Sequence, residues 1–274
     1  QLTNINITDT VNNNININIY NYLKSDAYKV EILKVACHAN AITATHQKTF
    51  GKYKNCHQGQ DVVLVATGPT LNDYEPIEGA IHLGVNSAFK FEKVILDYLF
   101  FQDYIAPSIK PYINELNNYV GNNCKKFYGI LQDTISRDWI IPESDTILAN
   151  AERYYVLSIW KYPPTKFTYD IANEILHCGH NVAITCMQFI LWTNPKKIYL
   201  VGCDCNSGGY FHNNSDDVRL SVESVNNFIY SWSKMKDFAK TYYPDTEIIS
   251  VNPVGLKGMF KDIYTKQNLF IMTR

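Results

Sequence analysis

Short apolar runs alternate along the chain with longer segments in which apolar residues recur at helical spacing. The clearest run is "DVVLVAT", residues 61–67, in which an acidic residue precedes five apolar ones, three of them valine. Uninterrupted runs of this kind are typical of strands buried on both faces of a parallel sheet. Similar patterns predict further strands at residues 80–85, 96–101, 125–131, 196–202 and 247–251.

Helices are predicted between these strands. Segment 222–243 carries apolar residues along one face, and segment 181–192 is mostly apolar, as expected of a buried helix. Residues 107–120 suggest a helix between two strands, and residues 20–48 have helical character without proline or glycine. Strands that alternate with helices favour an α/β fold: a doubly wound, mainly parallel, Rossmann-like sheet forming a single nucleotide-binding domain.

We expect two parts in the chain. Residues 1–58 form an N-terminal extension that is partly helical, and residues 59–274 form the α/β domain. Within that domain, residues from about 132 to 175 are rich in proline and aromatic side chains without clear periodicity. We expect this segment to be an irregular, lid-like insertion.

Polar residues follow the predicted strands at the points where the strands end. In an open parallel sheet, ligands bind beyond the carboxyl ends of the strands, so these residues are candidates for a site. They are Thr67, Gly68, Pro69, Thr70, Asn86, Gln102, Asp103 and Asp204. Each also has a structural explanation, because Thr70 and Asn86 suit helix caps, Gly68 suits a turn, and Asp204 suits a loop cap. Their shared position is what favours a ligand site.

Composition narrows the class of protein. The formal net charge is −1, which gives no sign of a nucleic-acid-binding surface. Seven irregularly spaced cysteines indicate reduced thiols, without the paired spacing of a metal site, in a cytoplasmic protein. No apolar run reaches the length of about 20 residues that a membrane helix needs. Twenty tyrosines and thirteen phenylalanines suit either a sugar or nucleotide site or ordinary packing.

Several familiar motifs do not occur. The sequence has no G-x-G-x-x-G turn, no Walker A lysine and no G-x-S-x-G elbow, and no Asp-x-Asp pair follows a strand. A phosphate would therefore be held differently, and a metal-bridged sugar nucleotide is not indicated.

The segments "VVLVATGPTLNDYEPI", "HLGVNSAF", "NVAITCMQFILWTNPKKIYLVGCDCNSGGYFHN" and "IISVNPVGLKGMF" occur in this order over residues 60–260. In them the chain resembles the bacterial sialyltransferases of glycosyltransferase family 42. It is also similar to the Maf-type flagellin glycosyltransferases and to pyrophosphokinase-like proteins of the same superfamily. The resemblance rests on a Gly-Pro-Thr-Leu turn after the first strand, an Asn after the second, and an "IYLVGCD" strand followed by a Gly-Tyr loop.

The resemblance implies a role for each matching residue. Thr67, Gly68, Pro69 and Thr70 would meet the phosphate and ribose of a cytidine nucleotide, and Asn86, Gln102 and Asn181 would contact the donor. Asp204 ends the key strand, Tyr210 would bond the leaving phosphate, and His212 would be the general base.

This chain also departs from the family pattern. Thr67 stands where the sialyltransferases have Asn, the segment before His212 is shorter, and Gly179-His180-Asn181-Val182 replaces an Arg-x-Thr-Ser turn.

The implied activity is the transfer of an acidic sugar from a CMP-activated donor to a glycan or glycolipid acceptor on the cell surface. The sugar would be sialic acid, a related nonulosonic acid or Kdo. Such an inverting transfer requires neither metal nor cofactor, because one phosphate leaves and hydroxyls or amides stabilise its charge. Histidine, with a pKa near 6.5, suits the base. Location at the inner face of a membrane and homo-oligomerisation stay open.

Two alternatives belong to other classes. One is a magnesium-dependent, pyrophosphokinase-like enzyme that would use Asp103 and Asp204 as metal ligands. The other is a non-catalytic nucleotide-binding domain within a larger protein.

Overall fold

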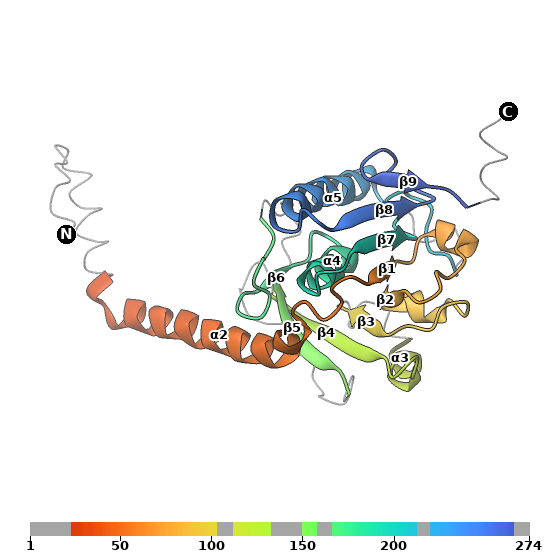
Figure 1. The fold of residues 1–274 in the computed structure, drawn as a ribbon. Coiled ribbons are helices and arrows are strands. Elements are labelled where there is room, and N and C mark those ends of the chain that lie inside the picture. The colour runs from red at the N-terminus through yellow and green to blue at the C-terminus, as the bar shows by residue number, and fades with distance from the viewer. Residues whose placement is uncertain (1–22, 103–111, 133–149, 158–165, 213–219, 266–274) are drawn as a thin grey trace, which may run out of the picture.

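A computed structural model describes residues 23–102, 112–132, 150–157, 166–212 and 220–265. Its centre is a nine-stranded sheet, and every strand pairs in parallel with its neighbours (Figure 1). The strands are β1 (Asp61–Val65), β2 (Ile81–Val85), β3 (Tyr98–Phe101), β4 (Lys125–Gln132), β5 (Glu152–Leu157), β6 (Leu176–His177), β7 (Lys197–Val201), β8 (Glu247–Val251) and β9 (Lys261–Ile263). The predicted α/β fold is confirmed.

The strand order places the two halves of the sheet on either side of β1. Strands run in the order β6-β5-β4-β3-β2-β1-β7-β8-β9, so the chain moves outward from β1 to β6 and then returns to the other side of β1. The return passes through helix α4 (Val182–Trp192). The direction of winding therefore reverses between β1 and β7, which is where ligands bind in doubly wound sheets.

Two cores cover the two faces of the sheet. On one face, alternate β1 residues Val62 and Leu64 pack with α4 and with α5 (Val222–Tyr242). On the other face, Val63 and Val65 pack against short helical turns and α3 (Ile113–Asn118). The turns are η2 (Pro69–Asp73), which follows β1 after three intervening residues, and η3 (Asn86–Lys90), which directly follows β2. Because β1 is buried on both faces, its apolar run has no polar alternation.

Much of the aromatic content serves packing. Phe100 and Phe127 stack with ring centroids 4.6 Å apart, and Phe189 of α4 lies 5.1 Å from each of them. Phe50 and Tyr154 join the same buried cluster. Aromatic pairs at such distances stabilise a core beyond the area that they bury. For these residues, packing rather than sugar binding explains the composition.

Part of the segment expected to be an irregular insertion belongs to the sheet. Strand β5 lies inside residues 132–175, pairs with β4 over six positions and buries Tyr154 and Val156 completely. The segment "ERYYVL" does not alternate between apolar and polar residues, so its sequence does not predict a strand. It forms one because β4 and β6 pair with it on either side. Strands β6 and β9 were also missed, because two or three residues carry no recognisable period. Residues 133–149 and 158–165 lie outside the described part of the chain.

The N-terminal extension contains a long helix and a short turn. Helix α2 spans Asp26–Phe50, and η1 spans Gly51–Tyr53. In Figure 1, α2 meets the body at its C-terminal end beside β5 and projects away from it over the rest of its length. No helix in the described ranges is both long and apolar enough to cross a membrane.

Candidate functional site

A cavity of about 200 Å³ lies at the carboxyl ends of β1 and β7, where the direction of winding reverses. Three groups of residues line it: the residues after β1, β2 and β7, the start of α4, and one side of α5. They are Ala66, Thr67, Gly68, Val85, Asn86, His180, Asn181, Val182, Ala183, Gly202, Cys203, Asp204, Cys205, Asn206, Gly209, Tyr210, Leu220, Phe228 and Trp232. Thr67, Gly68, Asn86, Asn181, Asp204 and Tyr210, all candidates from the sequence, thus lie around one cavity.

Gly68 is a glycine because two chain segments approach closely beside it. Its N–H donates to the carbonyl oxygen of Gly202 at 2.8 Å. A Cβ at position 68 would lie 2.6 Å from that oxygen and 2.6 Å from the carboxyl carbon of Asp204. Its φ of −69° is open to any residue, so the requirement is space. Other atoms of the protein occupy that space.

Asp204 joins the loop after β7 to the turn after β1. It is buried, and its carboxylate accepts hydrogen bonds from both the backbone N–H and the hydroxyl of Thr70. Burial raises the pKa of Asp204, and the two hydrogen bonds from Thr70 oppose that rise. Thr70 therefore contacts Asp204 and does not itself line the cavity. Pro69 does not line the cavity either.

Left-handed backbone surrounds the cavity. Asn86, His180 and Cys205 have positive φ angles of 46°, 66° and 46°. Such residues cost free energy unless the surrounding structure imposes them, and they cluster at functional sites. The side-chain oxygen Oδ1 of Asn86 is buried and has no hydrogen-bond partner among the residues described here. A ligand donor would satisfy it, since an unmet buried acceptor is costly.

The start of α4 faces the cavity. Asn181 is its N-cap: its side-chain oxygen accepts the N–H of Ile184 at 3.1 Å. Val182 and Ala183 in the first turn line the cavity. A helix start presents unpaired backbone N–H groups and the positive end of the helix dipole, so it favours an anionic ligand group. No lysine or arginine of the described residues lines the cavity.

Tyr210 and His212 lie together at the edge of the site. Their rings stack in parallel with centroids 5.7 Å apart. The imidazole Nε2 of His212 lies 2.8 Å from the hydroxyl of Ser87, the residue after Asn86. Between them, the N–H of Phe211 donates to the carbonyl oxygen of Thr67 at 2.9 Å. The loop after β7 is thereby held against the ends of β1 and β2.

Gln102 does not line this cavity. Gln102 is buried, and its amide nitrogen donates to Tyr154 at 3.1 Å and to Thr185 at 2.7 Å. It thus connects β3 to β5 and α4 inside the core. Asp103 lies outside the described residues.

Sequence reasoning missed the apolar side of the cavity. Phe228 and Trp232 come from α5 and Leu220 from just before it, on the C-terminal side of the other lining residues. On the sequence, the two aromatic residues were assigned only to the buried face of a helix. Cys205, also in the lining, has its pKa raised to about 12 by burial, so its thiol is protonated at neutral pH.

The described residues contain all seven cysteines, and no disulfide joins any two of them. Within the same ranges, no group of three or more His, Cys, Asp or Glu side chains is placed to hold a metal ion.

No protein-family model matches the sequence, and no curated protein matches it. Among solved structures, the Maf glycosyltransferase from Magnetospirillum magneticum AMB-1 is similar in fold, at 12% identity and a TM-score of 0.46. The match covers 83% of this chain but only 39% of that one.

The sialyltransferase CstII in complex with a trisaccharide acceptor and CMP is 11% identical, with 76% of this chain and 88% of that chain covered and a TM-score of 0.45. CstII from Campylobacter jejuni with CMP-3FNeuAc is 10% identical over the same shares, with a TM-score of 0.41. At these identities and TM-scores, the likeness is one of fold alone.

Proposed function

We propose that the protein is a glycosyltransferase that transfers an acidic sugar from a CMP-activated donor to a glycan or glycolipid acceptor. The observation that carries the proposal is the cavity between β1 and β7, which joins Gly68, Asn86, Asp204 and Tyr210. These are residues of the turn, strand and loop motifs on which the sequence resemblance rests. Residues 59–274 would form the catalytic unit.

The lining has two chemically different sides, which suit the two ends of a nucleotide sugar. The start of α4 offers the backbone N–H groups of its first turn to a phosphate. Phe228 and Trp232 offer an apolar surface to a base or sugar ring. Because CMP carries a single phosphate, hydroxyl and amide donors suffice to stabilise the leaving group. The unmet Oδ1 of Asn86 would accept a donor from the nucleotide.

In the proposed reaction, the acceptor hydroxyl oxygen attacks the anomeric carbon of the donor sugar. The bond from that carbon to the phosphate oxygen breaks, CMP departs with the bonding electrons, and His212 takes the proton of the hydroxyl. Tyr210, which lines the cavity and stacks on His212, would donate its hydroxyl proton in a hydrogen bond to the departing phosphate.

Ser87 and Asp204 would position these groups. The hydroxyl of Ser87, hydrogen-bonded to Nε2 of His212, fixes the direction of the imidazole. Through Thr70, Asp204 fixes the β1 turn against the β7 loop. In this scheme the carboxylate of Asp204 holds the site together while His212 is the base.

The site departs from the sialyltransferase pattern at Thr67 and at His180-Asn181, both of which line the cavity. The proposal therefore names a class of donor, the CMP-activated acidic sugars, rather than one sugar.

The test has two stages. Thermal unfolding of the full chain is first measured with CMP, CDP, UDP, GDP and ATP, each with and without Mg²⁺. We expect CMP to raise the melting temperature without metal, because binding to the native state stabilises it by mass action. A shift with ATP that needs Mg²⁺ would replace the proposal with a phosphotransferase, and no shift with any nucleotide would indicate a non-catalytic domain.

The second stage uses CMP-sialic acid and CMP-Kdo with a panel of glycan acceptors and measures the release of CMP. Release that depends on an acceptor supports transfer. Release without dependence on any acceptor would mean hydrolysis and would contradict the proposal.

A further inference from the structure

The N-terminal part of α2 extends beyond the other helices and strands that the structure describes. We call residues 26–41 of this helix the arm. Contacts with the body begin at Thr43, whose hydroxyl donates to the carbonyl oxygen of Asn173 at 3.0 Å, and continue through His46 and Thr49. Along the arm, Ile32, Leu33 and Val35 are 50%, 63% and 64% exposed. Figure 1 shows the arm projecting from the body.

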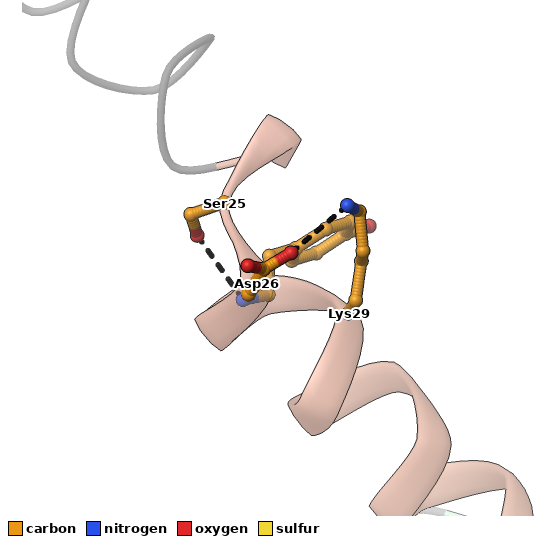
Figure 2. Close-up of polar contacts among 4 residues, drawn as sticks. Ser25, Asp26 and Lys29 are labelled. Carbon is orange, nitrogen blue, oxygen red and sulfur yellow. Dashed lines mark hydrogen bonds and ion pairs between the residues drawn. The ribbon is translucent and has the colours of Figure 1, made fainter.

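The arm nevertheless begins with a specific helix start. The hydroxyl of Ser25 accepts the N–H of Tyr28 at 3.2 Å, and Lys29 forms an ion pair with Asp26 in the first turn at 3.0 Å (Figure 2). A Ser N-cap and an acidic first turn favour a helix at this position. A lone helix of such length is only marginally stable in water, since most helical stability comes from packing of an apolar face.

The arm carries such a face. Ile32, Val35, Ala39 and Ile42 follow one another at alternating steps of three and four residues. The same alternation continues to His46 and Thr49, which are buried against the body. The stripe that docks the C-terminal end of α2 is therefore continuous with the stripe exposed along the arm.

We propose that this stripe pairs with the same stripe of a second copy of the chain, so that the arms form a helical dimer interface. Alternating steps of three and four are the pattern that two helices use to pack along their length. A second copy presents the same pattern. The stripe extends an interface that the helix already makes, and it lies outside the proposed site, so the inference does not depend on the proposed function.

A membrane surface fits the arm less well. A helix that lies in a lipid interface needs one strongly polar face. Lys29 and Lys34 are five residues apart and therefore point about 140° away from each other around the helix. The apolar residues Val30 and Leu33 lie between the two lysines, on the side of the helix opposite the stripe. The face opposite the stripe is therefore mixed and not strongly polar.

The interface would be small. At about 1.5 Å per residue the arm is about 24 Å long, which is short for a stable dimer contact. We therefore expect a dimer that dissociates on dilution within the micromolar range, as is typical of small interfaces.

Sedimentation velocity of the full chain over a dilution series tests the proposal. The wild type should pass from dimer to monomer on dilution. The variant I32E/V35E places two charges on the stripe and should be monomeric at every concentration. The control N40E/A41E adds the same two charges to exposed positions on the other side of the helix and should keep the wild-type dissociation curve. Thermal unfolding checks that the body is equally stable in all three proteins.

If the charged variant fails to fold, I32Q/V35Q should still weaken the dimer at least tenfold. A wild type that is monomeric throughout, a dimer that survives I32E/V35E, or an equal loss in N40E/A41E would each overturn the proposal.

Discussion

Two of the regions in which this protein buries polar side chains do so in opposite ways. Where α2 joins the body, His46 is fully buried, its Nδ1 lies 2.8 Å from the carbonyl oxygen of Glu174, and its Nε2 accepts the N–H of Tyr155 at 2.7 Å. Around the β1–β7 cavity, by contrast, Asn86 has a left-handed backbone and a buried oxygen with no partner among the described residues.

This difference distinguishes buried polar groups that stabilise the fold from buried polar groups that are available to a ligand. A group whose bonds all end on fixed backbone contributes to stability, and its removal leaves unmet partners. A buried polar group on strained backbone that lacks a hydrogen-bond partner within the protein is costly to maintain. A bound ligand is the natural candidate for that partner. The four predictions below test this distinction, beginning with the largest expected effect.

His212→Ala should lower turnover by about 10²–10⁴-fold while donor affinity changes little, because removing a general base typically has this cost. The measurement is steady-state CMP release together with CMP binding by calorimetry. Wild-type turnover in the variant would mean that the loop carrying His212 is not catalytic and would move the base to Asp103 or Asp204.

His46 should make the native state sensitive to acid. Burial lowers its pKa from 6.5 to about 4, and the bonds to Glu174 and Ile171 oppose the shift only in part. The unfolded chain therefore takes up a proton near pH 6.5 while the native state does not. Stability from this group is complete above that pH and is lost as the pH falls towards 4, in total about 3 kcal/mol.

Urea unfolding at a series of pH values measures this loss, and His46→Gln, which cannot be charged, is the control. Between pH 6.5 and 4 the wild type should lose about 3 kcal/mol more than the variant. Parallel curves would show that His46 does not stay neutral in the native state. CMP release at neutral pH should differ little, since α2 docks away from the cavity.

Tyr210→Phe should reduce turnover by about tenfold, as expected for one lost hydrogen bond to a charged leaving group. The stacked ring and its contact with His212 are retained in this variant, so packing at the edge of the site should not change. An effect confined to KM, with kcat preserved, would indicate that Tyr210 binds the donor equally in the ground state and does not assist departure.

Asn86→Ala is the smallest and most discriminating change. Because the side-chain oxygen has no partner in the described structure, its loss should cost no stability, while alanine at a φ of 46° should lower the free energy of unfolding by about 1 kcal/mol. CMP affinity should fall about threefold to tenfold, the range of one neutral hydrogen bond. A large loss of stability with unchanged CMP affinity would make Asn86 structural and remove the contrast with His46.

The sequence by itself determined the centre of the fold. The apolar run before Thr67 indicates burial on both faces, as in the strands of a covered parallel sheet. Once β1, β2 and β7 were recognised, the rule for carboxyl ends of strands brought Gly68, Asn86 and Asp204 to one edge, where the structure has them lining one cavity. These inferences succeeded because they depend on local pattern and on a general property of parallel sheets.

Only the tertiary structure decided the rest. Strand β5 forms because β4 and β6 lie beside it. The sequence "ERYYVL" has no alternation of apolar and polar residues from which the strand could be predicted. Trp232 and Phe228 reach the cavity because α5 crosses the sheet, and Ser87 meets His212 across 125 positions of chain. Gly68 is required by the approach of Gly202 and Asp204, which no turn pattern reveals. Contacts between distant segments depend on how the layers pack, and that packing is a property of the whole chain.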